Sequence, residues 1–404
     1  MTLDDLVPIE TVDVSGKTVL VRADLNVPMQ DGQVTDATRI SRLVPGLLSL
    51  SDRGARVVVL SHFGRPKGVA NRDLSLQPVA EALASIAERP VIFGPNCIGT
   101  EATAAVSKAG TGGLVVLENL RFHPGEEAND AAFAAQLAAL GDVFVGDAFS
   151  CAHRAHASTA AIADLMPAYA GPLMMAEINA LRSALDRPER PTVAVVGGAK
   201  VSTKLPVLTH LIGKVDHLVV GGGMANTFLL ARGVPVGRSL AEPDLVATAS
   251  EIAGTAERAG CTLHLPTDVA VAPEFKDGAP ATLVSVDAVP ADQMILDIGP
   301  QSVAAIQQVV DTCRTLLWNG PLGAFEVTPF NRGTFDLAAH VAKRTASGQL
   351  ASIAGGGDTV AVLNAAGVTD QMTYVSTAGG AFLEWLEGRE LPGVAALLHA
   401  PKAS

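Results

Sequence analysis

The sequence has 404 residues, which is too long for one ordinary hydrophobic core and predicts two domains. Its net charge of -12 argues against nucleic acid as the main partner, and no apolar stretch reaches the roughly 18 residues that a membrane-spanning helix needs. The acidic first ten residues do not resemble a targeting segment, and the four scattered cysteines form no Cys-x-x-Cys pair, so we expect a cytoplasmic protein with neither disulfides nor a zinc site.

Short runs rich in valine, isoleucine and leucine recur along the chain, separated by alanine-rich segments long enough for helices. The runs are apolar throughout rather than alternating, which is typical of strands buried on both faces of a parallel sheet. In chain order the expected strands are Thr18–Val21, Arg56–Leu60, Leu114–Leu117, Val143–Val145, Thr192–Val196, His217–Val220, Thr282–Val286, Thr315–Trp318 and Tyr374–Val375. Such alternation of strands and helices predicts α/β layers with right-handed crossovers.

A helix is expected within residues 171–188, where Gly171-Pro172 begins it and Pro188 ends it. Its apolar residues are spaced to line one face. We therefore predict an α/β fold of two doubly wound parallel-sheet, Rossmann-like domains joined by this helix. The domains would span residues 1–170 and 189–384.

Charged and polar side chains follow the expected strands of the first half. Ligands of open α/β sheets bind beyond the carboxyl ends of the strands, and arginine pairs with phosphate or carboxylate through two hydrogen bonds. We therefore expect these side chains to bind a multiply charged anion, although each arginine or histidine alone is more simply a surface or structural residue, and Asp147 alone a helix cap. The side chains are Arg22, Asp24, Asn26, His62, Arg65, Glu118, Asn119, Arg121, Asp147, His153, Arg154 and His156, with Arg39 at the start of an expected helix.

Glycines follow the expected strands of the second half. They let the backbone approach a ligand closely and expose its N–H groups to phosphate oxygens, with lysines adding mobile charge. One such cluster could be only a tight turn, but five of them predict a nucleotide site, in which Asp358 is a candidate Mg²⁺ ligand. The clusters are Gly197-Gly198-Ala199-Lys200 with Lys204, Gly221–Gly223, Asn319-Gly320-Pro321, Gly355–Thr359 and Ser376–Gly380.

Two common phosphate-binding motifs are incomplete. Gly16-Lys17-Thr18 ends like a P-loop, but Thr11 stands where that motif needs glycine. The triple glycines also lack the last glycine of the dinucleotide fingerprint, since Asn226 and Val360 occupy its position. A nicotinamide-dependent dehydrogenase is therefore the weaker alternative. A non-catalytic sensor of phosphorylated metabolites is a second alternative.

Read together, these segments closely resemble the phosphoglycerate kinase family, nearly from end to end and in order. The segments that carry the resemblance are Val21–Pro28, Ser61–Pro66, Glu118–Phe122, Asp147–Phe149, His153–His156, Gly197–Val201, Trp318–Pro321 with Glu326, and Gly355–Thr359.

The resemblance implies reversible phosphoryl transfer between ATP and the carboxylate of 3-phosphoglycerate, giving ADP and 1,3-bisphosphoglycerate, with Mg²⁺. It implies a monomer that closes by hinge bending, a glycerate-binding first domain, a nucleotide-binding second domain, and a tail from about residue 385 to residue 404 that packs on the first domain. It leaves open whether the pathway is glycolytic or carbon-fixing.

Residue roles follow from matching motif positions. The resemblance assigns 3-phosphoglycerate to Asp24, Asn26, Arg39, His62, Arg65, Arg121 and Arg154. It assigns the nucleotide and its metal to Gly198, Ala199, Lys200, Lys204, Asn319, Glu326, Gly356, Gly357, Asp358 and Thr359, with Glu326 on the ribose and Asp358 on the metal. It assigns catalysis to Arg39, Lys204, Gly379 and Gly380.

The sequence departs from the family pattern at two positions. Ala378 stands where the family usually has a third glycine, so a methyl group could restrict a loop near the transferring phosphate. Thr203 stands where many relatives have aspartate, which would remove one possible metal partner. We expect neither change to abolish activity.

Overall fold

The computed structural model describes residues 2–401, which form two compact units. The first unit comprises the chain up to Ile178 and the segment from Glu390 onward, and the second comprises Asn179–Arg389. Within residues 2–401, every helix is too short or too polar to cross a lipid bilayer.

The first unit is built on a six-stranded sheet in the order β5-β6-β4-β1-β7-β8, and all neighbouring strands are parallel. Its strands are β1 (Thr18–Arg22), β4 (Arg56–Leu60), β5 (Val91–Gly94), β6 (Leu114–Leu117), β7 (Val143–Gly146) and β8 (Ala168–Ala170). Its helices are α1 (Thr38–Asp52), α2 (Gln77–Ala87), α3 (Gly99–Lys108), α4 (Pro124–Glu127), α5 (Ala131–Ala138) and α14 (Pro392–His399), and β2 (Met29–Gln30) pairs with β3 (Gln33–Val34) in a small hairpin.

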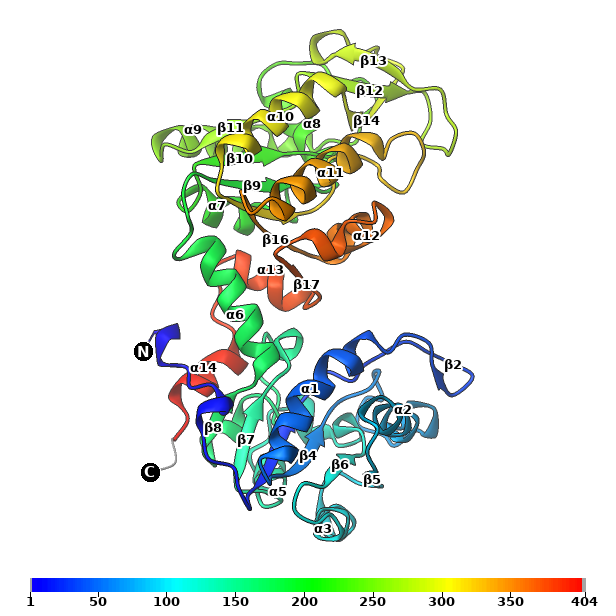
Figure 1. Cartoon of the computed structure of the whole chain (residues 1–404). Coiled ribbons are helices and arrows are strands. Elements are labelled where there is room, and N and C mark those ends of the chain that lie inside the picture. Colours follow the sequence, from blue (N-terminus) through cyan, green and yellow to red (C-terminus); the bar gives the residue numbers. More distant parts are fainter. Residues whose placement is uncertain (1, 402–404) are drawn as a thin grey trace. The chain divides into compact units, whose positions relative to one another are not determined.

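The segment after residue 390 completes the first unit. Helix α14, drawn in red in Figure 1, packs on β8 and on the 3-10 turns η5 (Phe149–Cys151) and η6 (Ala161–Asp164). The Gly393 amide donates to the Ala152 carbonyl at 2.8 Å. The fold of the first unit therefore depends on residues that lie far apart in the sequence.

Helix α6 (Pro172–Leu185) carries the chain from the first unit into the second. It begins on the Asp147 carboxylate, whose Oδ1 accepts from the backbone amides of Leu173 at 2.7 Å and Met174 at 3.1 Å. Burial raises the pKa of Asp147 to about 7, against the lowering effect of these two bonds. Asp147 is therefore a helix cap, which was the simpler interpretation of this strand-end residue.

The second unit is built on a parallel six-stranded sheet in the order β11-β10-β9-β15-β16-β17. Because the chain leaves β9 in one direction and returns on its other side at β15, the topological switch point lies between these two strands. The strands are β9 (Thr192–Val196), β10 (His217–Val220), β11 (Thr262–His264), β15 (Thr315–Asn319), β16 (Ala351–Gly355) and β17 (Tyr374–Ser376). The helices are α7 (Leu205–Ile212), α8 (Gly223–Ala231), α9 (Val246–Arg258), α10 (Pro300–Thr312), α11 (Arg332–Ala346), α12 (Gly357–Ala365) and α13 (Gly380–Leu386).

Two six-stranded parallel sheets confirm the predicted α/β fold, but one expected strand was misassigned. β13 (Thr282–Ser285) pairs antiparallel with β12 (Asp268–Ala272) in a separate three-stranded sheet that β14 (Met294–Ile298) completes. It is an edge strand, with Leu283 59% exposed while Val284 packs inward. An apolar run alone does not reveal whether both of its faces are covered, and here one face is open to solvent.

Candidate active site

The predicted anion-binding residues of the first unit follow four adjacent strands. In the sheet order β6-β4-β1-β7, Arg121 follows β6, His62 follows β4, Asp24 follows β1 and Arg154 follows β7. Because these strands are parallel, the four side chains start from the same edge of the sheet.

Asp24 holds Arg39 in place. The Asp24 Oδ2 atom accepts from Arg39 at 2.8 Å and from the Ser150 hydroxyl at 2.5 Å, and Arg39 also donates to the Asn26 carbonyl at 2.9 Å. The Asn26 side chain in turn accepts from the Gly64 amide at 3.0 Å. The Arg39 side chain is still 37% exposed, so its guanidinium can meet a ligand from solvent.

His62 is buried among cations. Burial, and next the nearby guanidiniums of Arg22, Arg121 and Arg154, hold the pKa of His62 well below its usual range. Burial and the same three arginines, with Arg121 the largest charge effect, lower the pKa of His156 to about 4. Both imidazoles are therefore neutral at pH 7, and the positive charge of this edge of the sheet comes from arginine.

Arg121 and Arg154 differ from Arg65 in how firmly they are held. Arg121 is buried, donates to the Gly64 carbonyl at 2.8 Å and lies 3.1 Å from Glu127 in an ion pair. Arg154 donates to His153 at 3.2 Å. Arg65 is exposed, and no group among residues 2–401 hydrogen-bonds to its guanidinium, so it is free to reach a ligand.

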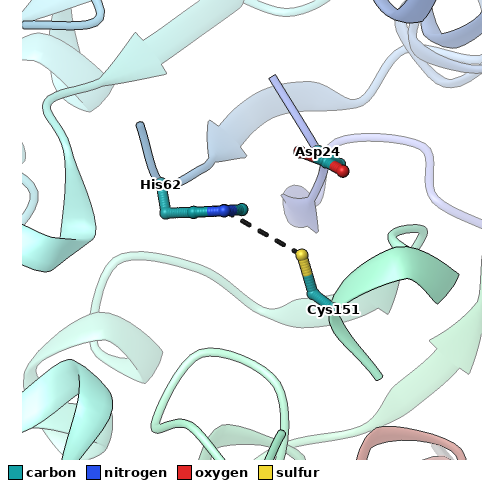
Figure 2. A group of neighbouring side chains, drawn as sticks. All are labelled: Asp24, His62 and Cys151. Atoms are coloured by element: carbon teal, nitrogen blue, oxygen red, sulfur yellow. Dashed lines mark hydrogen bonds between the residues drawn. The ribbon is translucent and has the colours of Figure 1, made fainter. Parts of the chain in front are cut away.

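Cys151 adds a third donor beside Asp24 and His62, which the sequence did not indicate. Figure 2 shows the three side chains together, and their donor atoms lie within 4.8 Å of one another. The distances alone would suit a soft cation. However, the Asp24 carboxylate already accepts from Arg39, His62 accepts from Arg22, and burial raises the pKa of the Cys151 thiol. The surrounding guanidiniums favour an anion at this position instead.

In the second unit, the loops after β9 and β15 meet backbone to backbone at the switch point. A methyl group on Gly197 would lie 1.8 Å from the Pro321 carbonyl oxygen. A methyl group on Gly320, whose φ is +108°, would lie 2.2 Å from the Gly197 carbonyl oxygen. Glycine is therefore required at both positions, because any side chain would separate the two loops.

A cavity of about 530 Å³ opens beside these loops. Four predicted nucleotide-binding residues line it: Gly198, Ala199, Glu326 and Asp358. Gly222, Gly223 and Pro321, from two other predicted glycine clusters, line it as well, whereas sequence reasoning missed Arg238, Phe275 and the residues of β14. Phe275 and β14 belong to the antiparallel sheet and its loops, and Arg238 lies in the segment after α8, so the strand-end rule gave no signal for them.

The other predicted nucleotide-binding residues lie next to the cavity loops. Lys204 donates to the Asn319 side-chain oxygen, and the Asn319 amide donates to the Gly355 carbonyl at 2.7 Å. Burial lowers the pKa of Lys204, against the raising effect of Asp358 and Glu387. The buried Thr359 hydroxyl accepts from the Gly320 amide at 2.7 Å. Lys200 and Gly357 are exposed, and Gly356 lies at the start of α12.

The two departures from the family pattern cause no strain. Ala378 is buried, but it is not among the described residues with positive φ. The positive φ of this loop belongs to Gly379, at +58°, directly before α13 and Gly380. Thr203 is exposed, and its hydroxyl donates to the Lys200 carbonyl at 2.9 Å.

Comparison with known proteins agrees with the resemblance over nearly the whole chain. The family model described as "Phosphoglycerate kinase" matches residues 9–389. A phosphoglycerate kinase of Sinorhizobium medicae is 58% identical over 393 residues, covering 97% of both chains, and one of Cereibacter sphaeroides is 58% identical over 397 residues, covering 98% of both.

Solved structures agree with the sequence relatives. Phosphoglycerate kinase from Coxiella burnetii superposes with a TM-score of 0.91 at 43% identity, covering 97% of this chain and 98% of that one. The enzyme from Pyrococcus horikoshii superposes with a TM-score of 0.79 at 29% identity over the same shares. With the predicted residues gathered at the strand ends of both sheets, the chain belongs to the phosphoglycerate kinase family.

Proposed function

We propose that this chain transfers a phosphoryl group reversibly between ATP and the carboxylate of 3-phosphoglycerate, giving ADP and 1,3-bisphosphoglycerate. Membership of the family supports the activity. The observation that carries it is the cluster of guanidiniums around neutral His62 at one edge of the first sheet. Arg65 and Arg154 form no ion pair within residues 2–401, so the cluster can still take up an anion, and a phosphorylated carboxylic acid supplies two anionic groups.

We assign the glycerate to the first unit. Arg65, Arg121 and Arg154 would bind the phosphate and His62 would donate to an acceptor oxygen, while Asp24 and Asn26 would hold the hydroxyl. Arg39 would lie beside the transferring phosphoryl group, because Asp24 orients its guanidinium while leaving it open to solvent. This division matches planar arginine donors to phosphate and leaves the short polar side chains for the hydroxyl.

We assign the nucleotide to the second unit. Gly198 and Ala199 line the cavity at the switch point, where backbone amides suit phosphate oxygens. Glu326 lines the same cavity and would bind the ribose. Lys200, Lys204, Asn319 and residues 356–359 would complete the phosphate end of the site, with Lys204 oriented by its bond to Asn319.

The residues of the cavity suit Mg²⁺. Asp358 is exposed, lies in the first turn of α12 and lines the cavity, and no hydrogen bond or ion pair within residues 2–401 engages its carboxylate. A free carboxylate beside a phosphate site is the type of ligand that Mg²⁺ uses together with substrate oxygens. Bound there, the ion would neutralise phosphate charge.

Transfer from ATP to a carboxylate needs no catalytic base. The carboxylate is ionised at pH 7 and is itself the nucleophile. The protein's part is to position the two substrates and to stabilise the negative charge on the transferring group. Arg39, Lys204 and the amides of Gly379 and Gly380 are the groups that we assign to this task. We further propose that the protein acts as a cytoplasmic monomer.

A coupled assay tests the proposal. Purified protein is mixed with ATP, Mg²⁺ and 3-phosphoglycerate, and a dehydrogenase consumes the acyl phosphate together with NADH. We expect NADH absorbance to fall only when all three additions are present. No turnover from folded protein, with a working coupling enzyme, would overturn the proposal in favour of a sensor of phosphorylated metabolites.

A further inference from the structure

Arg22, the last residue of β1, is buried, and its guanidinium hydrogen-bonds to three protein groups. Its Nε donates to the Ser158 hydroxyl at 2.8 Å, one terminal nitrogen donates to the Ala23 carbonyl, and the other lies 3.2 Å from His62 Nδ1. All three nitrogens of the guanidinium therefore have protein partners. Because Arg22 is buried and three of its five N–H groups are used in this way, we assign it to holding neighbouring groups in place.

The charge of Arg22 is matched through Ser158. Glu126 is fully buried, and its carboxylate accepts from the Ser158 hydroxyl at 2.6 Å and from the Ser158 amide at 3.0 Å. His156 lies 3.9 Å from the same carboxylate, but its pKa of about 4 leaves it neutral at pH 7. The nearest charged group that hydrogen bonds connect to Glu126, through the Ser158 hydroxyl, is therefore Arg22.

Chemistry fixes which group donates each hydrogen bond on the path from Arg22 through Ser158 to Glu126. A guanidinium only donates and a carboxylate only accepts, so the Ser158 hydroxyl must accept from Arg22 and donate to Glu126. For the same reason, His62 Nδ1 must accept from Arg22. A neutral imidazole has one N–H, so the proton of His62 must be on Nε2. No group within residues 2–401 hydrogen-bonds to Nε2, which leaves this donor available to a ligand.

We propose that Glu126, Ser158 and Arg22 form a buried relay that keeps neutral His62 protonated on Nε2, so that His62 presents a hydrogen-bond donor to an acceptor oxygen of the glycerate substrate. The three relay residues are positioning residues, which act on the substrate through His62. The opposite tautomer would turn the lone pair of Nε2 toward an anionic ligand and repel it. The contact with substrate rests on the proposed function, whereas the tautomer does not.

The tautomer is measured in the free protein. Two-bond ¹H–¹⁵N correlation spectra of histidine-labelled protein distinguish the two neutral tautomers and the imidazolium, and His62→Gln identifies the His62 signals. We expect the Nε2–H tautomer at pH 7 in the wild type, and loss of this preference in Ser158→Ala. A wild-type His62 that is charged, or protonated on Nδ1, would overturn the relay. This test uses the wild-type spectrum alone and needs no variant of Glu126, Ser158 or Arg22.

The matched control is Ser51→Ala. The Ser51 hydroxyl is also buried in the first unit, where it accepts from Arg89 at 3.0 Å and donates to the Gly112 carbonyl at 2.6 Å. Ser51 therefore resembles Ser158 in linking an arginine to a hydrogen-bond acceptor, but it is not among the residues of the candidate active site. We expect its loss to leave the His62 spectrum unchanged. A change as large as that in Ser158→Ala would contradict a specific relay.

Kinetics test the link to substrate. We expect Ser158→Ala to raise KM for 3-phosphoglycerate about three- to tenfold, the cost of one hydrogen bond, with kcat and KM for ATP nearly unchanged. In the His62→Gln background, where the glutamine amide supplies the donor, Ser158→Ala should have no further effect. An equal rise in both backgrounds would show that Ser158 does not act through His62. A correct tautomer without any KM effect would leave the relay intact and overturn the assignment of His62 to the glycerate.

Discussion

Arg39 is the residue whose removal should affect the chemical step most. Its guanidinium is oriented by Asp24 and remains partly exposed, and we assign it to the transferring phosphoryl group. Arg39→Ala should lower kcat about a hundredfold or more, as loss of one charge-stabilising donor does elsewhere, while both KM values change much less. Steady-state kinetics measures both quantities.

Arg89→Ala provides the matched control for this substitution. The Arg89 side chain is 39% exposed and forms a 2.7 Å ion pair with Asp52, much as Arg39 does with Asp24. It lies before β5, at the opposite end of the strand from the site. We expect wild-type kinetics from it. A raised KM with unchanged kcat in Arg39→Ala would refute the catalytic assignment.

At the residue scale, the sequence indicated the group of arginines and histidines at the edge of the first sheet, but not how these residues hydrogen-bond to the groups around them. Arg22 and Arg121 both follow apolar strands, so the pattern gave both the same anion-binding interpretation. The structure shows that the Arg22 guanidinium hydrogen-bonds to three protein groups, and that the Asp147 carboxylate accepts from the first amides of α6. The partners that decide this, such as Ser158, are distant in sequence and form no motif with Arg22.

At the scale of elements, the contact between the β9 and β15 loops should control nucleotide binding. Gly197→Ala would place a methyl group 1.8 Å from the Pro321 carbonyl oxygen, so the loops must separate. We expect this variant to lose about 1–3 kcal/mol of stability, the usual cost of overpacking. Calorimetric titration should also show weaker ATP binding, with KM for 3-phosphoglycerate unchanged.

Gly213→Ala serves as the control for a glycine in the same unit. A methyl group there would have no heavy atom within 4 Å, and Gly213 has no positive φ. Its stability and ATP affinity should remain close to wild type. If Gly197→Ala bound ATP as tightly as Gly213→Ala does, the loop contact would have no role in the nucleotide site.

Elements were predictable where one physical rule decided them. The runs Arg56–Leu60, Leu114–Leu117 and Thr192–Val196 are strands with the predicted bounds, because continuous apolar runs fit central parallel strands. The run Thr282–Val286 does form a strand, β13, but its expected place in a parallel sheet was wrong, because tertiary pairing sets its neighbours. β14, which lines the cavity, was missed because Asp297 interrupts its apolar run.

At the scale of the whole molecule, the proposal places the two substrates on different compact units. The carboxylate and the terminal phosphate must come into contact for transfer, so the units must approach each other when both substrates are bound. We expect small-angle scattering to show a smaller radius of gyration with both substrates than with either one alone. An unchanged radius with both sites saturated would contradict this prediction.

The return of the chain to the first unit has a consequence for the order of events during translation. Helix α14 covers β8, η5 and η6, yet the ribosome makes it only after the entire second unit. The amino-terminal part of a nascent chain usually folds first. Here the second unit is one continuous stretch and can finish packing before α14 exists. The surface that carries Ser150 and Cys151, in contrast, stays partly uncovered until the last segment of the first unit has been synthesised.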